Sequence, residues 1–288
     1  MKIAVSTYSF GKYVESLGID EIIRLTKEYG AEGIDVADES GSFEEKMEKA
    51  KVTAESCAKH GVELACYCVG ADFINGSEGD LQAEIDKVCK KVDIAEAYGF
   101  KVMRHDTAYG PKKGELTLRS FDSNLERIVE GCRAVTQYAK SKGIVTCTEN
   151  HGFFAQDSDR VEKIVNGVCD DNFGALVDMG NFMCADEAPE KAVSIMAQYA
   201  KHVHAKDFYW KSGMMDDPGE GWFKTRCKDY LKGAIIGHGV VPVRQCLNIL
   251  KSAKYDGWVA IEFEGMEDNL KGVRIGVANL KKAIEMLK

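Results

Sequence analysis

Short apolar runs alternate with longer amphipathic segments along this chain of 288 residues. Segments such as 42–61, 81–99 and 123–143 carry apolar residues every three or four positions, as amphipathic helices do. Eight apolar runs have the length and composition of β-strands: 2–8, 33–38, 62–69, 101–106, 144–150, 174–180, 202–208 and 258–264. This regular alternation predicts an α/β fold built on parallel strands.

The number of repeats distinguishes among the α/β folds. Eight strand–helix units in a chain of this length are typical of a (β/α)8 TIM barrel, because an open sheet usually has fewer strands. A doubly wound sheet is the alternative, but the first strand–helix turn, STYSFGKYVESLG, lacks the GxGxxG pattern that holds a dinucleotide. We therefore predict one TIM-barrel domain over residues 1–288. Segment 209–239 is too long for an ordinary loop, so we expect an insertion after the seventh strand that serves as a lid or a subunit contact.

Charge and composition exclude several classes of protein. The formal net charge is −8, and an acidic surface repels a nucleic-acid backbone, so no nucleic-acid partner is expected. The N-terminal apolar run is too short for a signal peptide, and no run approaches the roughly 20 residues that cross a bilayer. Ten cysteines without a CxxC pair are typical of free thiols in a reducing compartment. These features predict a cytoplasmic protein with no membrane contact.

Four consecutive predicted strands carry metal-ligating residues at or near their ends: Glu149, Asp178, His204 and Glu262. The carboxyl ends of barrel strands meet at one face of the fold, so these side chains should converge. Three carboxylates and an imidazole brought together repel one another unless a cation lies between them. The pattern therefore predicts a divalent metal site. Its oxygen-rich composition favours Mn²⁺, with Mg²⁺, Co²⁺ and Zn²⁺ as alternatives.

Strand alternation also indicates which neighbours share the interior. His202, His204 and Lys206 have the same parity on strand seven, so all three should face into the barrel. A buried lysine is costly without an anionic partner, which favours either a role at the site or an ion pair for Lys206.

The motifs ENHG, VDMGN, HVHAKD and KYDGWVAIEFEG resemble the xylose isomerase-like barrel superfamily. This superfamily of sugar phosphate isomerases and epimerases includes ketose 3-epimerases, hydroxypyruvate isomerases, inosose dehydratases and endonuclease IV. The resemblance spans the chain from KIAVSTYSF to VAIEFEG. It implies that Glu149, Asp178, His204 and Glu262 bind the metal, and that Glu149 and Glu262 also act as catalytic acid and base.

Two positions depart from the ketose 3-epimerases. Asn181 stands where those enzymes have a substrate-binding histidine, and Trp210 stands where they have an arginine. The resemblance therefore does not extend to a ketohexose 3-epimerase. Endonuclease IV needs further histidine and carboxylate ligands, one of them at the position of Asn181, so DNA repair is not expected.

Further residues are candidates for substrate binding. Arg104 and His105 have opposite parity, so only one can face the barrel interior, and we favour Arg104. His238 lies between two glycines, which suits both a close ligand approach and an ordinary turn. His151 could contact substrate or remain a loop histidine. We predict substrate contacts for His151, Lys206, Arg104, Asn181, His238 and Trp222.

These features predict an enzyme that acts on a small-molecule carbohydrate, either alone or as a homo-oligomer. The leading hypothesis is a divalent-metal-dependent isomerase or epimerase of a keto sugar or related polyol, which abstracts a proton beside a metal-bound carbonyl. The alternative is a metal-dependent lyase or dehydratase that acts on a keto sugar or 3-keto glycoside by β-elimination. A noncatalytic sugar-binding subunit is a third possibility, which the presence of both glutamates disfavours.

Overall fold

Eight parallel strands form a closed barrel in the order β1-β11-β7-β6-β5-β4-β3-β2. The computed structural model describes residues 1–112, 114 and 120–287. The barrel strands are β1 (Lys2–Ser6), β2 (Gly33–Ala37), β3 (Glu63–Val69), β4 (Val102–His105), β5 (Val145–Glu149), β6 (Phe173–Asp178), β7 (Ala200–Ala205) and β11 (Trp258–Ile261). Each strand overlaps one of the eight expected runs, so the predicted (β/α)8 barrel is confirmed.

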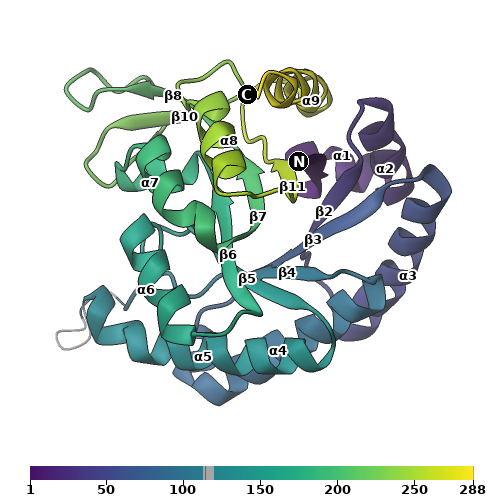
Figure 1. The fold of residues 1–288 in the computed structure, drawn as a ribbon, viewed down its shortest axis with the longest axis vertical. Helices are drawn as coiled ribbons and strands as arrows, with labels where there is room; N and C mark the ends of the chain where they lie inside the picture. The colour runs from purple at the N-terminus through teal and green to yellow at the C-terminus, as the bar shows by residue number, and fades with distance from the viewer. Residues whose placement is uncertain (113, 115–119, 288) are drawn as a thin grey trace.

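Helices surround the barrel (Figure 1). They are α1 (Tyr13–Leu17), α2 (Ile19–Glu28), α3 (Phe43–His60), α4 (Leu81–Tyr98), α5 (Phe121–Ser141), α6 (Ser158–Val168), α7 (Pro189–Met196), α8 (Val243–Ser252) and α9 (Asn269–Glu285). Short 3-10 helices include η1 (Thr7–Phe10), η2 (Gly76–Gly79), η3 (Asn181–Ala185) and η4 (Ala197–Tyr199). Within the described part of the chain, no helix is long and apolar enough to cross a membrane.

Helix α3 shows how local sequence sets these boundaries. The Ser42 hydroxyl accepts the backbone N–H of Glu45, and the Glu45 carboxylate accepts the backbone N–H of Ser42, which forms a capping box. Gly61 ends the helix with a φ of 66°, a left-handed conformation that costs glycine little. The chain then turns directly into β3.

Apolar packing holds the helices against the outside of the strands and fills the amino-terminal part of the barrel. Val203 and Ile261 face outward into the main core, whereas Ala4, Ala65 and Ala260 form a small interior cluster. A second interior cluster contains Cys66, Cys68, Cys147 and Leu176, and all ten cysteines are free. The interior therefore changes from alkyl and thiol groups to the charged residues at the carboxyl ends of the strands.

The segment after β7 forms a small antiparallel sheet in the order β8-β10-β9, visible beside the barrel in Figure 1. Its strands are β8 (Asp207–Lys211), β9 (Phe223–Lys224) and β10 (Tyr230–Ala234). Phe208 and Leu231 are buried and pack with Cys184 of η3. The Asp207 carboxylate accepts four backbone N–H groups, those of Phe208, Gly237, Gly239 and Val241. Asp207 thus anchors the base of the inserted segment.

Candidate metal centre

The four predicted ligands converge at the carboxyl ends of their strands. Glu149 and Asp178 end β5 and β6, His204 lies in β7, and Glu262 directly follows β11. His204 Nδ1 lies 3.6 Å from Glu262 Oε1, 3.9 Å from Glu149 Oε1 and 4.0 Å from Asp178 Oδ2. One ligand atom from each residue lies within 4.8 Å of all the others. Atoms at such separations can share one cation, because metal–ligand bonds are about 2.0–2.4 Å long.

Several atoms in this cluster lack the hydrogen bonds that buried polar groups normally make. His204 Nδ1 and Asp178 Oδ2 are buried without a hydrogen-bond partner, although the Lys206 ammonium group lies 3.3 Å from Asp178 Oδ2. Asp178 Oδ1, in contrast, accepts the backbone N–H groups of Gly180 and Asn181 at 2.8 and 2.9 Å, which leaves Oδ2 facing the cluster. An imidazole lone pair and carboxylate oxygens left facing one another are unfavourable without a cation. The residues therefore fit a divalent metal ion.

Burial and mutual charge shift the ionisation of the cluster. Burial raises the pKa of Asp178 to about 6, although the Lys206 charge opposes the rise. Burial would lower the pKa of His204, but the carboxylates of Glu262 and Asp35 hold it well above its ordinary value. Burial would also raise the pKa of Glu262, yet Lys206 and His204 hold it well below the usual range. In the metal-free protein, a proton on His204 thus supplies part of the positive charge.

Lys206 supplies a second positive charge. Its Nζ lies 2.6 Å from Glu262 Oε2 and 3.3 Å from Asp178 Oδ2, and it donates a hydrogen bond to Asn181 Oδ1 at 3.0 Å. Only 4% of Lys206 is exposed. The ion pairs explain how a lysine is tolerated in the interior.

Glu149 is held from two sides. Asn181 Nδ2 donates to Glu149 Oε1 at 3.0 Å, and the Arg104 guanidinium forms an ion pair with Glu149 Oε2. Arg104 also lies 3.3 Å from Asp106 Oδ2. Its neighbour His105 instead packs against the rings of Phe73 and Phe173. Of the two candidates on β4, Arg104 is therefore the one that faces the barrel interior.

His151 lies beside this group and is partly open to solvent. Its Nδ1 is 3.0 Å from Asp106 Oδ1, and 42% of its side chain is exposed. The Tyr109 hydroxyl donates to the other oxygen of Asp106 at 2.7 Å. Burial opposes protonation of His151, but Asp106 raises its pKa above the ordinary value. Asp106 thus fixes the orientation of the His151 ring.

Other predicted substrate residues make their contacts elsewhere. His238 is exposed in the turn that follows β10. Trp222 directly precedes β9, and its ring lies near the ammonium groups of Lys211 and Lys232, at 5.2 and 5.3 Å. Among the described residues, the structure records no contact between either side chain and the four candidate ligands. Their predicted contacts with substrate remain predictions.

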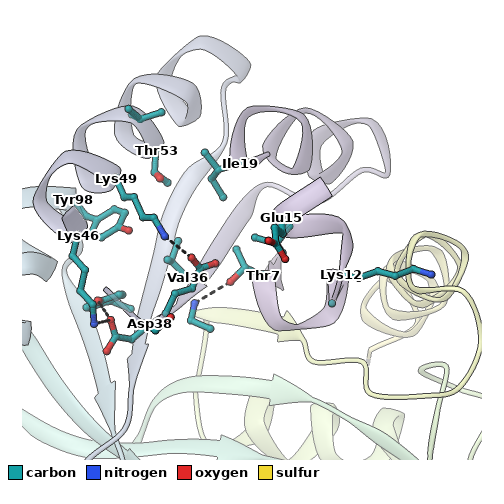
Figure 2. Close-up of a pocket in the computed structure, with 17 residues that line it drawn as sticks. Thr7, Lys12, Glu15, Ile19, Val36, Asp38, Lys46, Lys49, Thr53 and Tyr98 are labelled. Carbon is teal, nitrogen blue, oxygen red and sulfur yellow. Dashed lines mark hydrogen bonds and ion pairs between the residues drawn. The ribbon is translucent and has the colours of Figure 1, made fainter. Parts of the chain in front are cut away.

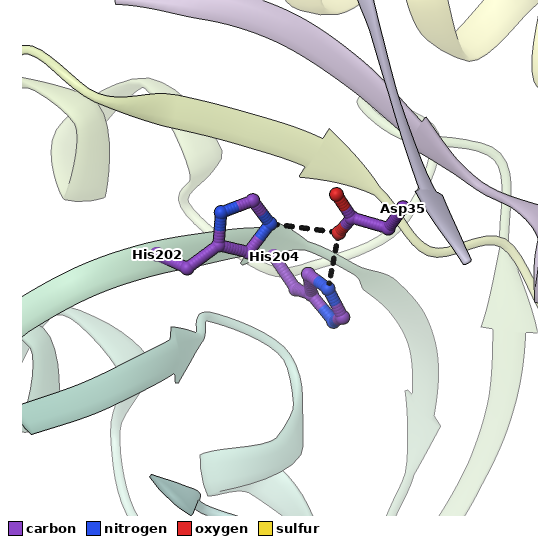
Figure 3. Close-up of side chains that lie close together, drawn as sticks. All are labelled: Asp35, His202 and His204. Atoms are coloured by element: carbon purple, nitrogen blue, oxygen red, sulfur yellow. Dashed lines mark hydrogen bonds and ion pairs between the residues drawn. The ribbon is translucent and has the colours of Figure 1, made fainter. Parts of the chain in front are cut away.

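Asp35 is not among the site residues predicted from the sequence, and it lies on β2 across the barrel from His204. Asp35 Oδ2 is 2.7 Å from His202 Nε2 and 3.0 Å from His204 Nε2 (Figure 3). All three side chains are fully buried. The available signal was one acidic residue at an inward position of the otherwise apolar strand GIDVA.

A cavity of about 820 Å³ opens on the outer side of the barrel between α1 and α3 (Figure 2). Asp38 lies in its wall, where the carboxylate accepts the Tyr67 hydroxyl at 2.7 Å and pairs with Lys46 and Lys91 at 2.7 and 3.2 Å. Because Asp38 and these lysines already neutralise one another, this cavity is a weaker candidate for a metal or catalytic site than the buried cluster.

Comparison with known proteins agrees with this architecture. A family model described as xylose isomerase-like TIM barrel matches residues 23–288. An inosose dehydratase from Yersinia enterocolitica is 24% identical over 204 residues, which cover 65% of this chain and 66% of that protein. The chain thus spans just under two thirds of that relative.

Two solved structures share the fold over nearly their whole lengths. The 3-keto-D-glucoside 4-epimerase from E. coli has a TM-score of 0.72 at 16% identity, with 98% of this chain and 99% of that chain covered. A xylose isomerase-like TIM barrel protein from Mycobacterium smegmatis, in complex with magnesium, has a TM-score of 0.70 at 14% identity, with 98% and 97% covered. At these identities the likeness shows the fold alone.

Proposed function

Because the chain belongs to the xylose isomerase-like TIM barrel family, we propose that it is a divalent-metal-dependent isomerase or epimerase of a keto sugar or related polyol. One observation carries this proposal. Glu149 and Glu262 present two carboxylates to the same buried point as His204 Nδ1, and a different cationic side chain accompanies each of them.

Glu149, Asp178, His204 and Glu262 would hold the cation. Three oxygen donors and one nitrogen suit Mn²⁺ first, and Mg²⁺ next. When bound, the metal would polarise a substrate carbonyl and so acidify the adjacent C–H bond. The Mycobacterium smegmatis protein of the same fold is in complex with magnesium, which supports the proposal of a divalent ion.

The two glutamates can then move the proton. They belong to β5 and to the end of β11, which are separated in the barrel by β6 and β7, so they approach a substrate from different sides. If one carboxylate removes a proton and the other returns it to the opposite face, the carbon is epimerised. If the proton returns to the neighbouring carbon, the sugar is isomerised.

Neighbouring residues would orient these two carboxylates and adjust their charge. Asn181 and Arg104 fix both oxygens of Glu149, which limits its rotation. Lys206 places a positive charge next to Glu262, where it can also stabilise negative charge that develops on a substrate oxygen. His151, held by Asp106, is positioned to bind a sugar hydroxyl.

A lyase is the second candidate, because the Yersinia relative is named an inosose dehydratase. Both reactions begin with removal of a proton beside a carbonyl. Elimination follows when the resulting enolate expels a hydroxyl or an alkoxy group from the β-carbon. The same four ligands and the same base would serve either outcome.

Metal analysis and isotope exchange together test the proposal. The purified protein would be analysed for bound metals, and the Mn²⁺-loaded form incubated in D₂O with a panel of free sugars and 3-keto sugars. We expect deuterium at a carbon beside a carbonyl. A product of unchanged composition apart from deuterium would indicate isomerisation or epimerisation, whereas loss of water or of an aglycone would indicate a lyase. Absence of both metal affinity and exchange would overturn the proposal.

A further inference from the structure

Asp35, His202 and His204 form a buried triad (Figure 3). The triad contacts His204 through Nε2, whereas the other candidate metal ligands lie near Nδ1. Both imidazoles contact the same carboxylate oxygen, Asp35 Oδ2, at 2.7 and 3.0 Å. The second oxygen of Asp35 is buried without a hydrogen-bond partner. Within the described chain, these two histidines are therefore the hydrogen-bond partners of the Asp35 side chain.

This contact determines which nitrogen of His204 carries a proton. An ionised carboxylate can only accept hydrogen bonds, so His204 must donate from Nε2. The lone pair of a neutral His204 ring then lies on Nδ1, the atom that faces Glu149, Asp178 and Glu262. The opposite tautomer would direct an N–H at the cation position and set the Nε2 lone pair against the Asp35 carboxylate.

A purely structural explanation does not account for a carboxylate at this position. Asp35 is paired in register with Cys66 on β3, beside the thiol and alkyl groups of the barrel interior. A carboxylate moved from water into such surroundings loses much of its hydration, and an apolar side chain of similar size would avoid that cost. An acidic residue at this position is explained if its hydrogen bond to His204 contributes to function.

We propose that Asp35 is a positioning residue that holds His204 in the Nε2–H tautomer and so presents Nδ1 to a divalent cation. This inference rests on the proposed function, because it needs a cation at the cluster. His202 supports Asp35 through the second hydrogen bond to the same oxygen. Carboxylates that accept a hydrogen bond from a metal-binding histidine orient the ring and increase its basicity.

The test compares Asp35→Asn with Asp38→Asn. Asp38 follows the same strand and is also largely buried, but it pairs with lysines and Tyr67 on the outer side of the barrel. Mn²⁺ dissociation constants would be measured by electron paramagnetic resonance on metal-stripped proteins at neutral pH. We expect affinity to fall by about 10–100-fold in Asp35→Asn, with little change in Asp38→Asn. Circular dichroism and thermal melts of the metal-free proteins would establish that both variants fold.

A folded Asp35→Asn variant with wild-type Mn²⁺ affinity would overturn the inference and leave the proposed function intact. If only its melting temperature fell, Asp35 would be a structural residue. A wild-type protein that bound no divalent cation would instead remove the proposed function, and this inference with it.

A measurement on the wild-type protein covers the case in which Asp35→Asn does not fold. The chain has six histidines, so ¹⁵N NMR of histidine-labelled protein loaded with Zn²⁺ can resolve each ring. We expect His204 to carry its proton on Nε2 and to bind the metal through Nδ1. A proton on Nδ1 in the loaded protein would overturn the inference.

Discussion

Lys206 and Glu262 form a buried ion pair inside the candidate metal centre, with Nζ 2.6 Å from Oε2. The same ammonium group lies 3.3 Å from Asp178 Oδ2. The Lys206 ammonium group thus neutralises part of the negative charge of two carboxylates that a divalent cation would also contact. The metal-free protein is therefore expected to depend on Lys206 more strongly than the metal-loaded protein does.

Replacement of Lys206 by methionine tests this dependence. Loss of one partner of a buried ion pair typically costs about 3–5 kcal/mol, because the remaining charge is left uncompensated. We expect a lower melting temperature in the metal-free variant and a larger stabilisation by Mn²⁺ than in the wild type. Lys211→Met serves as the control, since Lys211 is exposed on the small sheet. Equal metal-free melting temperatures for Lys206→Met and the wild type would contradict this account.

Glu262→Gln and Glu149→Gln test the proposed acid and base. An amide cannot take up the substrate proton, so deuterium exchange from D₂O into the sugar should fall by roughly two to four orders of magnitude in each variant. Glu264→Gln is the control, because Glu264 lies 3.6 Å from Lys206 but is not a candidate ligand. The exchange can be followed by proton NMR. Near-normal turnover in either test variant would show that the roles are wrongly assigned.

Much of this arrangement was predictable because it follows from strand periodicity. The apolar runs predict eight strands, and the barrel brings the ends of adjacent strands together, so Glu149, Asp178, His204 and Glu262 could be expected to converge. Alternation likewise predicts that His204 and Lys206 share the interior. Because β5, β6, β7 and β11 lie side by side in the closed barrel, the fold class alone was enough to predict that these four residues lie close together.

Contacts across the barrel and within the inserted segment could not be obtained in the same way. Asp35 lies on β2, which is separated from β7 by β1 and β11, so its contact with His204 depends on how side chains fill the interior. Glycines beside His238 and aromatic residues around Trp222 do not reveal where their segments pack. The small sheet and the Asp207 anchor became apparent only from the structure.

Metal stabilisation should depend on pH. The pKa of Asp178 is raised from 3.8 to about 6, and that of His204 is held well above 6.5. The folded metal-free protein therefore binds both protons more tightly than the unfolded chain, and this stabilisation is lost as pH rises through the raised pKa values. A bound cation displaces the protons, so its contribution grows over the same range.

The expected result is a Mn²⁺-induced increase in melting temperature that becomes larger between about pH 5 and pH 7. Thermal melts with and without Mn²⁺ across this range would measure it. A metal effect that did not vary with pH would show that proton displacement makes no contribution.

Asn181 offers a way to separate catalysis from metal binding. Its amide N–H donates to Glu149 Oε1, and its carbonyl accepts from Lys206 Nζ, each at 3.0 Å. Asn181 therefore connects one proposed acid or base, Glu149, to the lysine that pairs with the other, Glu262. Asn181 is not among the four candidate ligands. We therefore expect Asn181→Leu to disturb the acid and base while it leaves the ligand set in place.

A hydrogen bond to a charged group contributes about 1.5–3 kcal/mol, which corresponds to a rate decrease of about 10–100-fold if Glu149 is no longer held in position. The Mn²⁺ dissociation constant should change far less, because all four ligands remain. Steady-state kinetics and metal titration on the same preparation would separate the two effects. Parallel losses of turnover and metal affinity would instead mean that Asn181 supports the geometry of the metal ligands, and the proposed link to proton transfer would have to be withdrawn.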